Sequence, residues 1–219
     1  MGSGRTRADV AAVAGPGLAG IRLPKTETAD AVVQTAAWLS GAGCDAGVVP
    51  LIESALGVER AFEIACADPA VMGLAMGEAD LSADLRVRDE EGLAYARSRC
   101  VVAARAAGLA GAVQSVYTAV SDLAGLRVST ERGRAAGFVG RSAVHPSQVP
   151  VINEVFTPSQ AERTAAEEVL AALGAAAAGR GVAVTTDGRF VDEAVARSAR
   201  AVLALARLAG GKPAGHCAG

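Results

Sequence analysis

The chain has 219 residues, of which 51% are hydrophobic and 20% are charged, so we expect a globular protein with a sizeable core. A net charge of −2 and an aromatic content of 3% argue against nucleic-acid binding, because no basic surplus is present to neutralise phosphates. The first ten residues lack the apolar segment of a signal peptide, and no apolar run reaches about 18 residues, so we expect neither export nor membrane insertion.

The four cysteines, Cys44, Cys66, Cys100 and Cys217, show no C-x-x-C spacing. We expect them to be reduced and structural, as in a cytoplasmic protein. Only two histidines are present, which argues against a histidine-rich zinc site.

Hydrophobic periodicity predicts alternating helices and strands along the first two thirds of the chain. Helices are expected at about residues 6–14, 28–39, 56–67, 90–107 and 131–136, and strands at about 20–24, 47–52, 71–76, 111–117 and 137–140. A polar loop is expected over 82–88, and another over 141–148. Five βα units at this spacing predict an α/β protein with a parallel sheet or a barrel.

The remainder of the chain is expected to be mostly helical. A short helix is predicted at 150–154, and a long alanine-rich helix from Thr157 to about residue 178, with Thr157 as its N-cap and Pro158 in the first turn. A small hairpin with an Asp187-Gly188 turn is predicted over 182–190, followed by a last helix at about 191–208. We place the boundary between a partial barrel, 1–156, and a C-terminal segment, 157–219, at the start of the long helix.

Two apolar strands each stop at an acidic residue, the strand at 47–52 at Glu53 and the strand at 71–76 at Asp80. Ligands of parallel α/β sheets bind at the carboxyl ends of the strands. Two carboxylates there can share one hard divalent cation. The alternative is that both are helix-start or turn residues on a solvated rim, and spacing alone leaves the two interpretations open.

Six motifs in order resemble the citrate lyase beta-subunit-like branch of the HpcH/HpaI aldolase family, over about residues 17–206. The motifs are LPKTET (23–28), PLIESALGV (50–58), GLAMGEADLSADL (73–85), YARSR (95–99), GFVGRSAVHPSQV (137–149) and FTPS (156–159). The resemblance implies a (β/α)8 TIM barrel with a C-terminal lid segment, usually in trimers. It implies a Mg2+-dependent carbon–carbon lyase that cleaves or forms a 3-hydroxyacyl-CoA, such as citryl-, malyl- or citramalyl-CoA, with an acyl-CoA and a 2-oxo acid as products. Some members are malyl-CoA thioesterases instead.

The resemblance also implies roles for single residues. Glu53 and Asp80 match the two metal ligands of the family, with Glu53 beside the substrate as well. Lys25 is expected to offset thioester or enolate charge as a catalytic residue, or else to be a solvated surface lysine. Glu27 is expected to hold a metal-bound water or Lys25, or to be structural. Glu78 is expected to cap a loop.

Three further positions follow from the same resemblance. The backbone from Phe138 to Gly140 is expected to line the pantetheine channel of CoA, because glycine allows close approach. His145 is expected to fix its loop by a hydrogen bond, in preference to acid–base work. Asp192 matches the lid aspartate that reaches a neighbouring subunit's active site as acid/base; the alternative is an N-cap of the last helix.

The chain also departs from the family pattern. Family members carry three further strands before this point, the third ending in an R-x-N motif whose arginine binds the substrate carboxylate. Five strands cannot close a barrel, so we expect a misassigned start, a fragment, a partner that supplies the missing strands, or a non-catalytic remnant. Gln114 replaces a common aspartate, and Arg141 replaces a common lysine.

Overall fold

The computed structural model describes residues 6–177 and 183–210. The chain divides into two compact units, Met1–Ile152 and Asn153–Gly219. None of the described helices is long and apolar enough to span a membrane.

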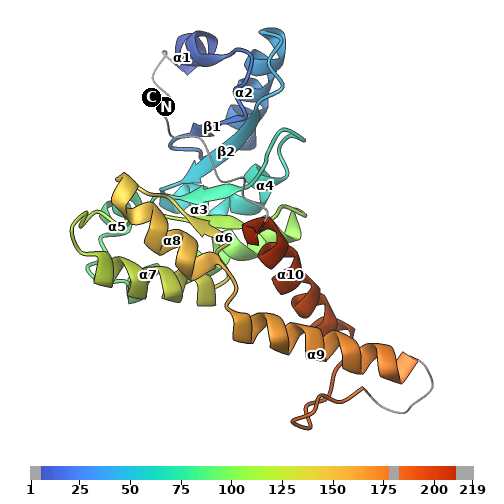
Figure 1. Ribbon diagram of the computed structural model, residues 1–219. Helices are drawn as coiled ribbons and strands as arrows, with labels where there is room; N and C mark the ends of the chain where they lie inside the picture. The colour runs from blue at the N-terminus through green and yellow to red at the C-terminus, as the bar shows by residue number, and fades with distance from the viewer. Residues whose placement is uncertain (1–5, 178–182, 211–219) are drawn as a thin grey trace, which may run out of the picture. The chain divides into compact units, whose positions relative to one another are not determined.

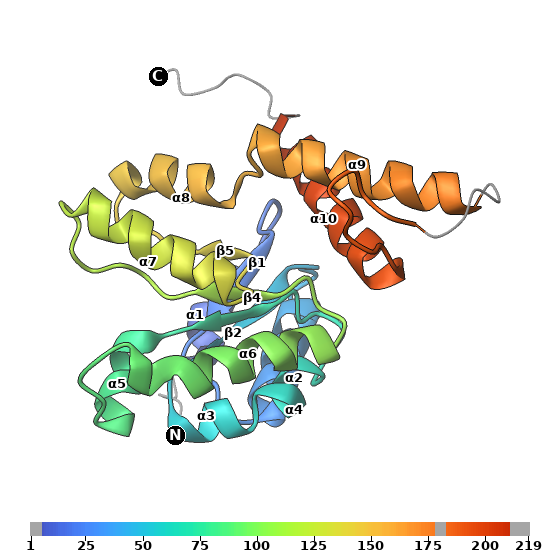
Figure 2. The same cartoon turned by 90° about the horizontal axis from the view of Figure 1, so that it is seen from below.

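The first unit is built on a five-stranded, all-parallel sheet (Figures 1 and 2). Its strands are β1 (Gly20–Leu23), β2 (Gly47–Ile52), β3 (Leu74–Met76), β4 (Ala112–Gln114) and β5 (Gly140–Arg141). They lie in sequence order, β1-β2-β3-β4-β5, so each connection leads to the neighbouring strand. The prediction of five βα units is therefore confirmed.

The sheet is curved, although β1 and β5 do not pair and the barrel is not closed. In a flat sheet these strands would lie four spacings apart, roughly 19 Å. The Nη1 of Arg22 in β1 nevertheless donates a hydrogen bond to the Oγ of Ser142, just after β5, at 2.6 Å. One arginine side chain reaches across only because the sheet bends toward its own far edge, as the wall of a barrel does.

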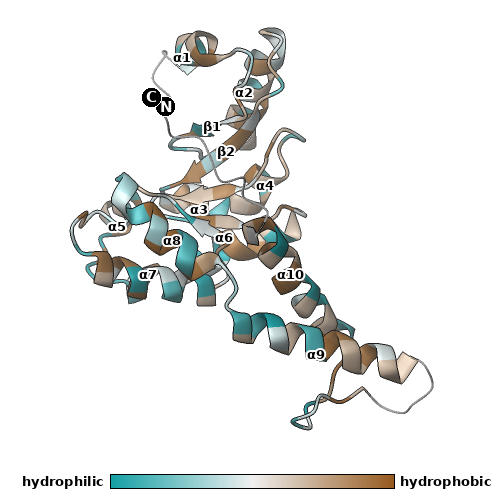
Figure 3. Ribbon diagram, in the orientation of Figure 1, coloured by the Kyte–Doolittle hydropathy of each residue, from teal (hydrophilic) through white to brown (hydrophobic). Residues whose placement is uncertain are grey.

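One helix precedes the first strand, and the others follow the strands. The helices are α1 (Thr6–Val13), α2 (Ala29–Gly41), α3 (Ala55–Glu59), α4 (Ala61–Ala65), α5 (Glu78–Leu85), α6 (Ala94–Ala106), α7 (Leu123–Ala135) and α8 (Val149–Phe156), with 3-10 turns η1 (Glu91–Leu93) and η2 (Pro146–Gln148). Helices α2, α4 and α6 pack on the sheet. Three helices of this unit begin at residue types that are preferred as N-caps: Thr28 caps α2, Ser54 caps α3 and Asp122 caps α7. Figure 3 shows hydrophobic colour along β2 and hydrophilic bands interleaved along α7.

Several predicted boundaries are wrong. The polar loop expected at 82–88 is in part helix, because α5 begins at Glu78 and runs to Leu85. The helix expected at 56–67 is two short helices, broken at Arg60, whose φ of −93° and ψ of 9° leave the helical region. The strand expected at 71–76 begins only at Leu74, and Val71 makes an isolated bridge to Val48.

Helix α7 begins eight residues before its predicted start because Asp122 accepts a hydrogen bond from the N–H of Gly125 at 2.8 Å and nucleates the first turn. Glycine and β-branched or hydroxyl residues within this helix weaken its sequence signal. Packing decides the matter, since Leu126, Thr130 and Gly133 are buried.

The second unit contains α9 (Gln160–Ala177) and α10 (Glu193–Gly210), which pack against each other. The predicted N-cap Thr157 is wrong: its hydroxyl donates back to the carbonyl of Asn153 in α8. Ser159 caps α9 instead, in a reciprocal box in which Ser159 Oγ accepts from the Glu162 N–H and Glu162 Oε2 accepts from the Ser159 N–H. The predicted hairpin is present as an antiparallel bridge between Val184 and Phe190, and residue 182 lies outside the described residues.

Candidate active site

Glu53 is held in a fixed orientation at the carboxyl end of β2. Its side chain is buried, and its Oε1 accepts a hydrogen bond of 2.7 Å from the backbone N–H of Lys25, which follows β1. Gly77, after β3, leaves room for it: a Cβ added at Gly77 would lie 2.5 Å from Glu53 Oε2 and 2.7 Å from Glu53 Cβ. Residues after three neighbouring strands therefore define the position of this carboxylate.

Lys25 adopts a left-handed backbone conformation, with φ of 49°, which is uncommon for a residue with a Cβ. This conformation turns its N–H onto Glu53, and its Nζ lies 3.4 Å from Oδ1 of Asp80. Lys25 thus contacts both predicted metal ligands. The ion pair to Asp80 is 75% and 54% exposed at its two side chains, so solvent screens it and it adds little stability.

Asp80 lies in the first turn of α5, three residues beyond the glycine that follows β3. Two hydrogen bonds fix this helix: the N–H of Glu78 donates to Ser115 Oγ after β4 at 3.0 Å, and Asp84 accepts from the N–H of Ala55 at 2.7 Å. The carboxylate is therefore presented by a helix N-terminus and is tied to the turn that carries Glu53.

The pKa of Glu53 reflects both its burial and the charges around it. The pKa of Glu53 is raised, first by burial and also by the negative charge of Asp80, while the Lys25 N–H and ammonium oppose the rise. Carboxylate oxygens are the donors that suit Mg2+. Among the described residues no group of three or more His, Cys, Asp or Glu side chains forms a metal site. A Mg2+ ion held by Glu53 and Asp80 would need water or substrate oxygens to complete its shell, and the role of both residues as metal ligands stays a prediction.

Other predicted residues have different surroundings. Glu78 is not a loop cap through its side chain: both its carboxylate oxygens accept from Arg97, at 2.9 and 2.7 Å. Glu27 lies after β1 on the groove described below, beside Lys25. His145 makes the expected loop-fixing contacts, with Nδ1 2.8 Å from Ser147 Oγ and accepting from the Ser147 N–H.

The predicted CoA-lining residues differ from each other. Phe138 is buried in the core, and its backbone N–H donates to the carbonyl of Gly133 in α7. Phe138 precedes β5, so it lies at the amino end of that strand, away from the carboxyl ends that carry Glu53. A Cβ at Gly140 would meet no atom within 4 Å, so the chain's own packing does not require glycine there. The role of both in CoA binding stays a prediction.

Asp192 belongs to the second unit. Its Oδ1 accepts from the N–H of Val195 at 2.9 Å, at the start of α10. The alternative N-cap role is thus present in the structure, and acid/base work by Asp192 stays a prediction.

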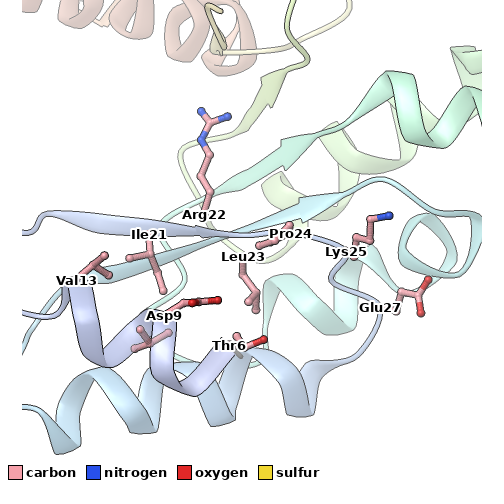
Figure 4. Close-up of a pocket in the computed structure, with 10 residues that line it drawn as sticks. Thr6, Asp9, Val13, Ile21, Arg22, Leu23, Pro24, Lys25 and Glu27 are labelled. Carbon is pink, nitrogen blue, oxygen red and sulfur yellow. The ribbon is translucent and has the colours of Figure 1, made fainter. Parts of the chain in front are cut away.

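A groove of about 570 Å³ runs along β1 and was not foreseen from the sequence. Apolar side chains from α1 and β1, including Val10, Ile21 and Leu23, form its wall, and Lys25 lies at one end (Figure 4). Arg22 points away from Ile21 and Leu23, toward the other face of the sheet (Figure 4). The alternation of apolar and polar residues in β1 is the sequence signal that could have predicted this arrangement.

The curved parallel sheet with acidic side chains at the carboxyl ends of its strands defines an α/β protein of the TIM-barrel type. The family model described as HpcH/HpaI aldolase/citrate lyase matches residues 2–146. The chain belongs to the HpcH/HpaI aldolase/citrate lyase family.

Named relatives agree with that assignment. The chain is 40% identical to a (3S)-malyl-CoA thioesterase of Cereibacter sphaeroides over 204 residues, which cover 91% of this chain and 69% of the relative. It is 34% identical to the citrate lyase subunit beta of Leuconostoc mesenteroides subsp. cremoris, over 90% of this chain and 68% of the relative. It is thus shorter than these relatives.

A solved structure shows the same fold. The protein CitE of Mycobacterium tuberculosis, in complex with magnesium, acetoacetate and coenzyme A, superposes with a TM-score of 0.76 at 31% identity. The match covers 94% of this chain and 75% of the CitE chain.

Proposed function

We propose that this protein is a Mg2+-dependent carbon–carbon lyase of CoA esters, which converts a 3-hydroxyacyl-CoA such as citryl-, malyl- or citramalyl-CoA into an acyl-CoA and a 2-oxo acid, or runs the reverse reaction. The observation that carries the proposal is the arrangement of Glu53, Lys25 and Asp80. Magnesium and coenzyme A bound to the related CitE support it.

The chain's own residues have separable tasks in this reaction. Glu53 and Asp80 would hold the cation, which would supply Lewis-acid polarisation of a substrate oxygen. The N–H of Lys25 fixes Glu53, and its ammonium, close to Asp80, offsets negative charge that develops at the thioester. Asp192 acts as the acid/base group of the reaction, as its match to the lid motif implies. Gly140 leaves room for the pantetheine arm of CoA.

The binding test is calorimetry with Mg2+ in the presence of oxaloacetate or glyoxylate. We expect heat with the wild type and its loss with Glu53→Gln, because the amide removes the charge that the cation requires. Glu63→Gln is the matched control, since Glu63 is an exposed glutamate on α4. Equal heat with Glu53→Gln and the wild type would contradict the proposal.

A malyl-CoA thioesterase is the second candidate, supported by the 40% identity to the (3S)-malyl-CoA thioesterase. Product analysis separates the two. A lyase releases a 2-oxo acid or glyoxylate together with an acyl-CoA, whereas a thioesterase releases free CoA thiol without either. Metal binding with neither product would favour a non-catalytic protein.

A shared active site follows if the protein forms the trimers expected from the family. Glu53→Gln and Asp192→Asn variants, each inactive alone, should then regain activity when mixed, because one subunit supplies the metal ligands and its neighbour the acid/base residue. Mixtures that stay inactive would contradict a role for Asp192 across subunits.

A further inference from the structure

A second cleft, of about 370 Å³, lies beside the metal-ligand pair but is separate from it. It opens between α5 and α7 at the carboxyl ends of β4 and β5. Its polar lining includes Glu78, Ser82, Ser115, Tyr117, Ser129 and Arg141. Its volume falls in the range of small-molecule sites.

Arg141 is the unusual member of this lining. Its guanidinium is half-buried and lies over the ring of Tyr117, 5.4 Å from the ring centroid. Both of its hydrogen bonds are made by Nη1, to the hydroxyls of Ser129 at 3.0 Å and Thr130 at 3.2 Å. Its Nε is buried and has no hydrogen-bond partner in the described chain. Burial lowers the pKa of Arg141, yet an arginine remains charged at any physiological pH.

No carboxylate of the described residues forms an ion pair with Arg141. Glu78 and Glu90 are the acidic groups with the largest electrostatic effect on Arg141, but both form ion pairs with other arginines. Arg97 lies 2.7 Å from Glu78 and 3.6 Å from Glu90, and Arg132 lies 3.6 Å from Glu90. Glu78 and Glu90 therefore act on the charge of Arg141 only from a distance, and its direct side-chain contacts among the described residues are hydroxyls and an aromatic face. A buried charge without a close partner of opposite sign is costly.

Asp89 and Glu90 also line the cleft, and neither forms an ion pair with Arg141 among the described residues. Asp89 at the rim accepts a hydrogen bond from the N–H of Gly92, and Arg88 lies next to it in the lining. Hydroxyls such as that of Ser82 add neutral donors. A half-buried, already oriented guanidinium without an ion pair among the described residues, set in a cleft with hydroxyl groups, is the kind of donor set that recognises carboxylate or phosphate oxygens.

We propose that this cleft binds an oxyanion, a phosphate or carboxylate group of a small molecule, and that Arg141 is its principal ligand. Nη1 is fixed by Ser129 and Thr130, so the guanidinium plane is already oriented and little side-chain entropy is lost on binding. The site needs neither the metal nor the proposed reaction, so its failure leaves the lyase proposal intact.

The test uses the full chain stripped of metal with EDTA and then dialysed free of the chelator. This excludes an anion held through a cation at Glu53 and Asp80, and it leaves no EDTA carboxylates to compete for the site. Inorganic phosphate and malonate are titrated separately by calorimetry, and the tighter of the two identifies the class of oxyanion. We expect Arg141→Gln to weaken binding roughly tenfold or more, since charge-assisted hydrogen bonds are lost.

A second pair of variants avoids the folding risk at Arg141, whose hydrogen bonds hold α7. Thr118 is exposed on the rim of the cleft. Thr118→Glu brings a negative charge there and should weaken anion binding, whereas Thr118→Gln, its neutral match, should not. The proposal is overturned if the wild type binds neither anion, or if Thr118→Glu or a folded Arg141→Gln binds as tightly as the wild type.

Discussion

Replacing Gly77 by alanine tests the geometry on which the metal site depends. The new methyl would lie 2.5 Å from Glu53 Oε2, against an ordinary contact of about 3.5 Å or more, so the carboxylate must move by roughly 1 Å. Glu53 is buried and bonded to the Lys25 N–H, which leaves it little room to yield. We expect a loss of about 1–3 kcal/mol in the free energy of unfolding, reduced slightly by the lower entropy of the unfolded alanine chain.

The same displacement should weaken Mg2+ binding by about tenfold to a hundredfold, the usual cost of disturbing the support of a metal ligand. Urea denaturation and calorimetry measure the two effects. Gly140→Ala is the matched control, because a Cβ there meets nothing within 4 Å and stability should not fall. If Gly77→Ala unfolds at the wild-type urea concentration and binds Mg2+ equally well, Glu53 is not held as described and the reasoning is refuted.

Three further outcomes are expected. Lys25→Gly should be more stable than Lys25→Ala by about 1 kcal/mol, because glycine adopts the left-handed backbone freely. The glycine variant should keep the N–H bond to Glu53 while losing the ammonium. Urea unfolding measures the difference in stability, and equal stability of the two variants would count against the left-handed turn. Ser159→Ala should lower the free energy of unfolding by about 1 kcal/mol, because the cap of α9 is lost. Thr157→Ala should change it very little, because the Thr157 hydroxyl only bonds back into α8. A larger loss of stability for Thr157→Ala than for Ser159→Ala would restore Thr157 as the cap. Burial raises the pKa of Cys100 to about 12, so above about pH 9 the unfolded chain ionises this thiol and the folded chain does not. Stability should therefore fall as pH rises from 8 to 10.5, and more steeply in the wild type than in Cys100→Ala; parallel slopes in the two proteins would contradict the assigned pKa.

The site shows how far residue patterns reach. Apolar runs that end at Glu53 and Asp80 predicted that both carboxylates lie at the carboxyl ends of neighbouring strands, because parallel strands all point one way. The pattern could not show that Asp80 sits on the first turn of α5, since the helix depends on Gly77 and on the bond from Glu78 to Ser115. Nor could it show the contact of Lys25 with both carboxylates, which requires a left-handed turn at a residue that is not glycine.

Side chains remote in sequence account for the other misses. Glu78 pairs with Arg97, nineteen positions along the chain, so its charge links α5 to α6. Arg141 gains Tyr117 and the hydroxyls of α7 as neighbours only when β4, β5 and α7 are assembled. Local propensity carries no information on such pairs.

The amino-acid order alone fixed the alternation of strands and helices, their parallel direction and the end of the sheet at which acidic groups gather, because hydrophobic periodicity and caps act over a few residues. Tertiary structure alone decided the curvature that lets Arg22 reach Ser142, the room that Gly77 leaves for Glu53, and the surroundings of Arg141, which has no ion-pair partner among the described residues. These depend on distances between segments far apart in the chain, which only packing sets.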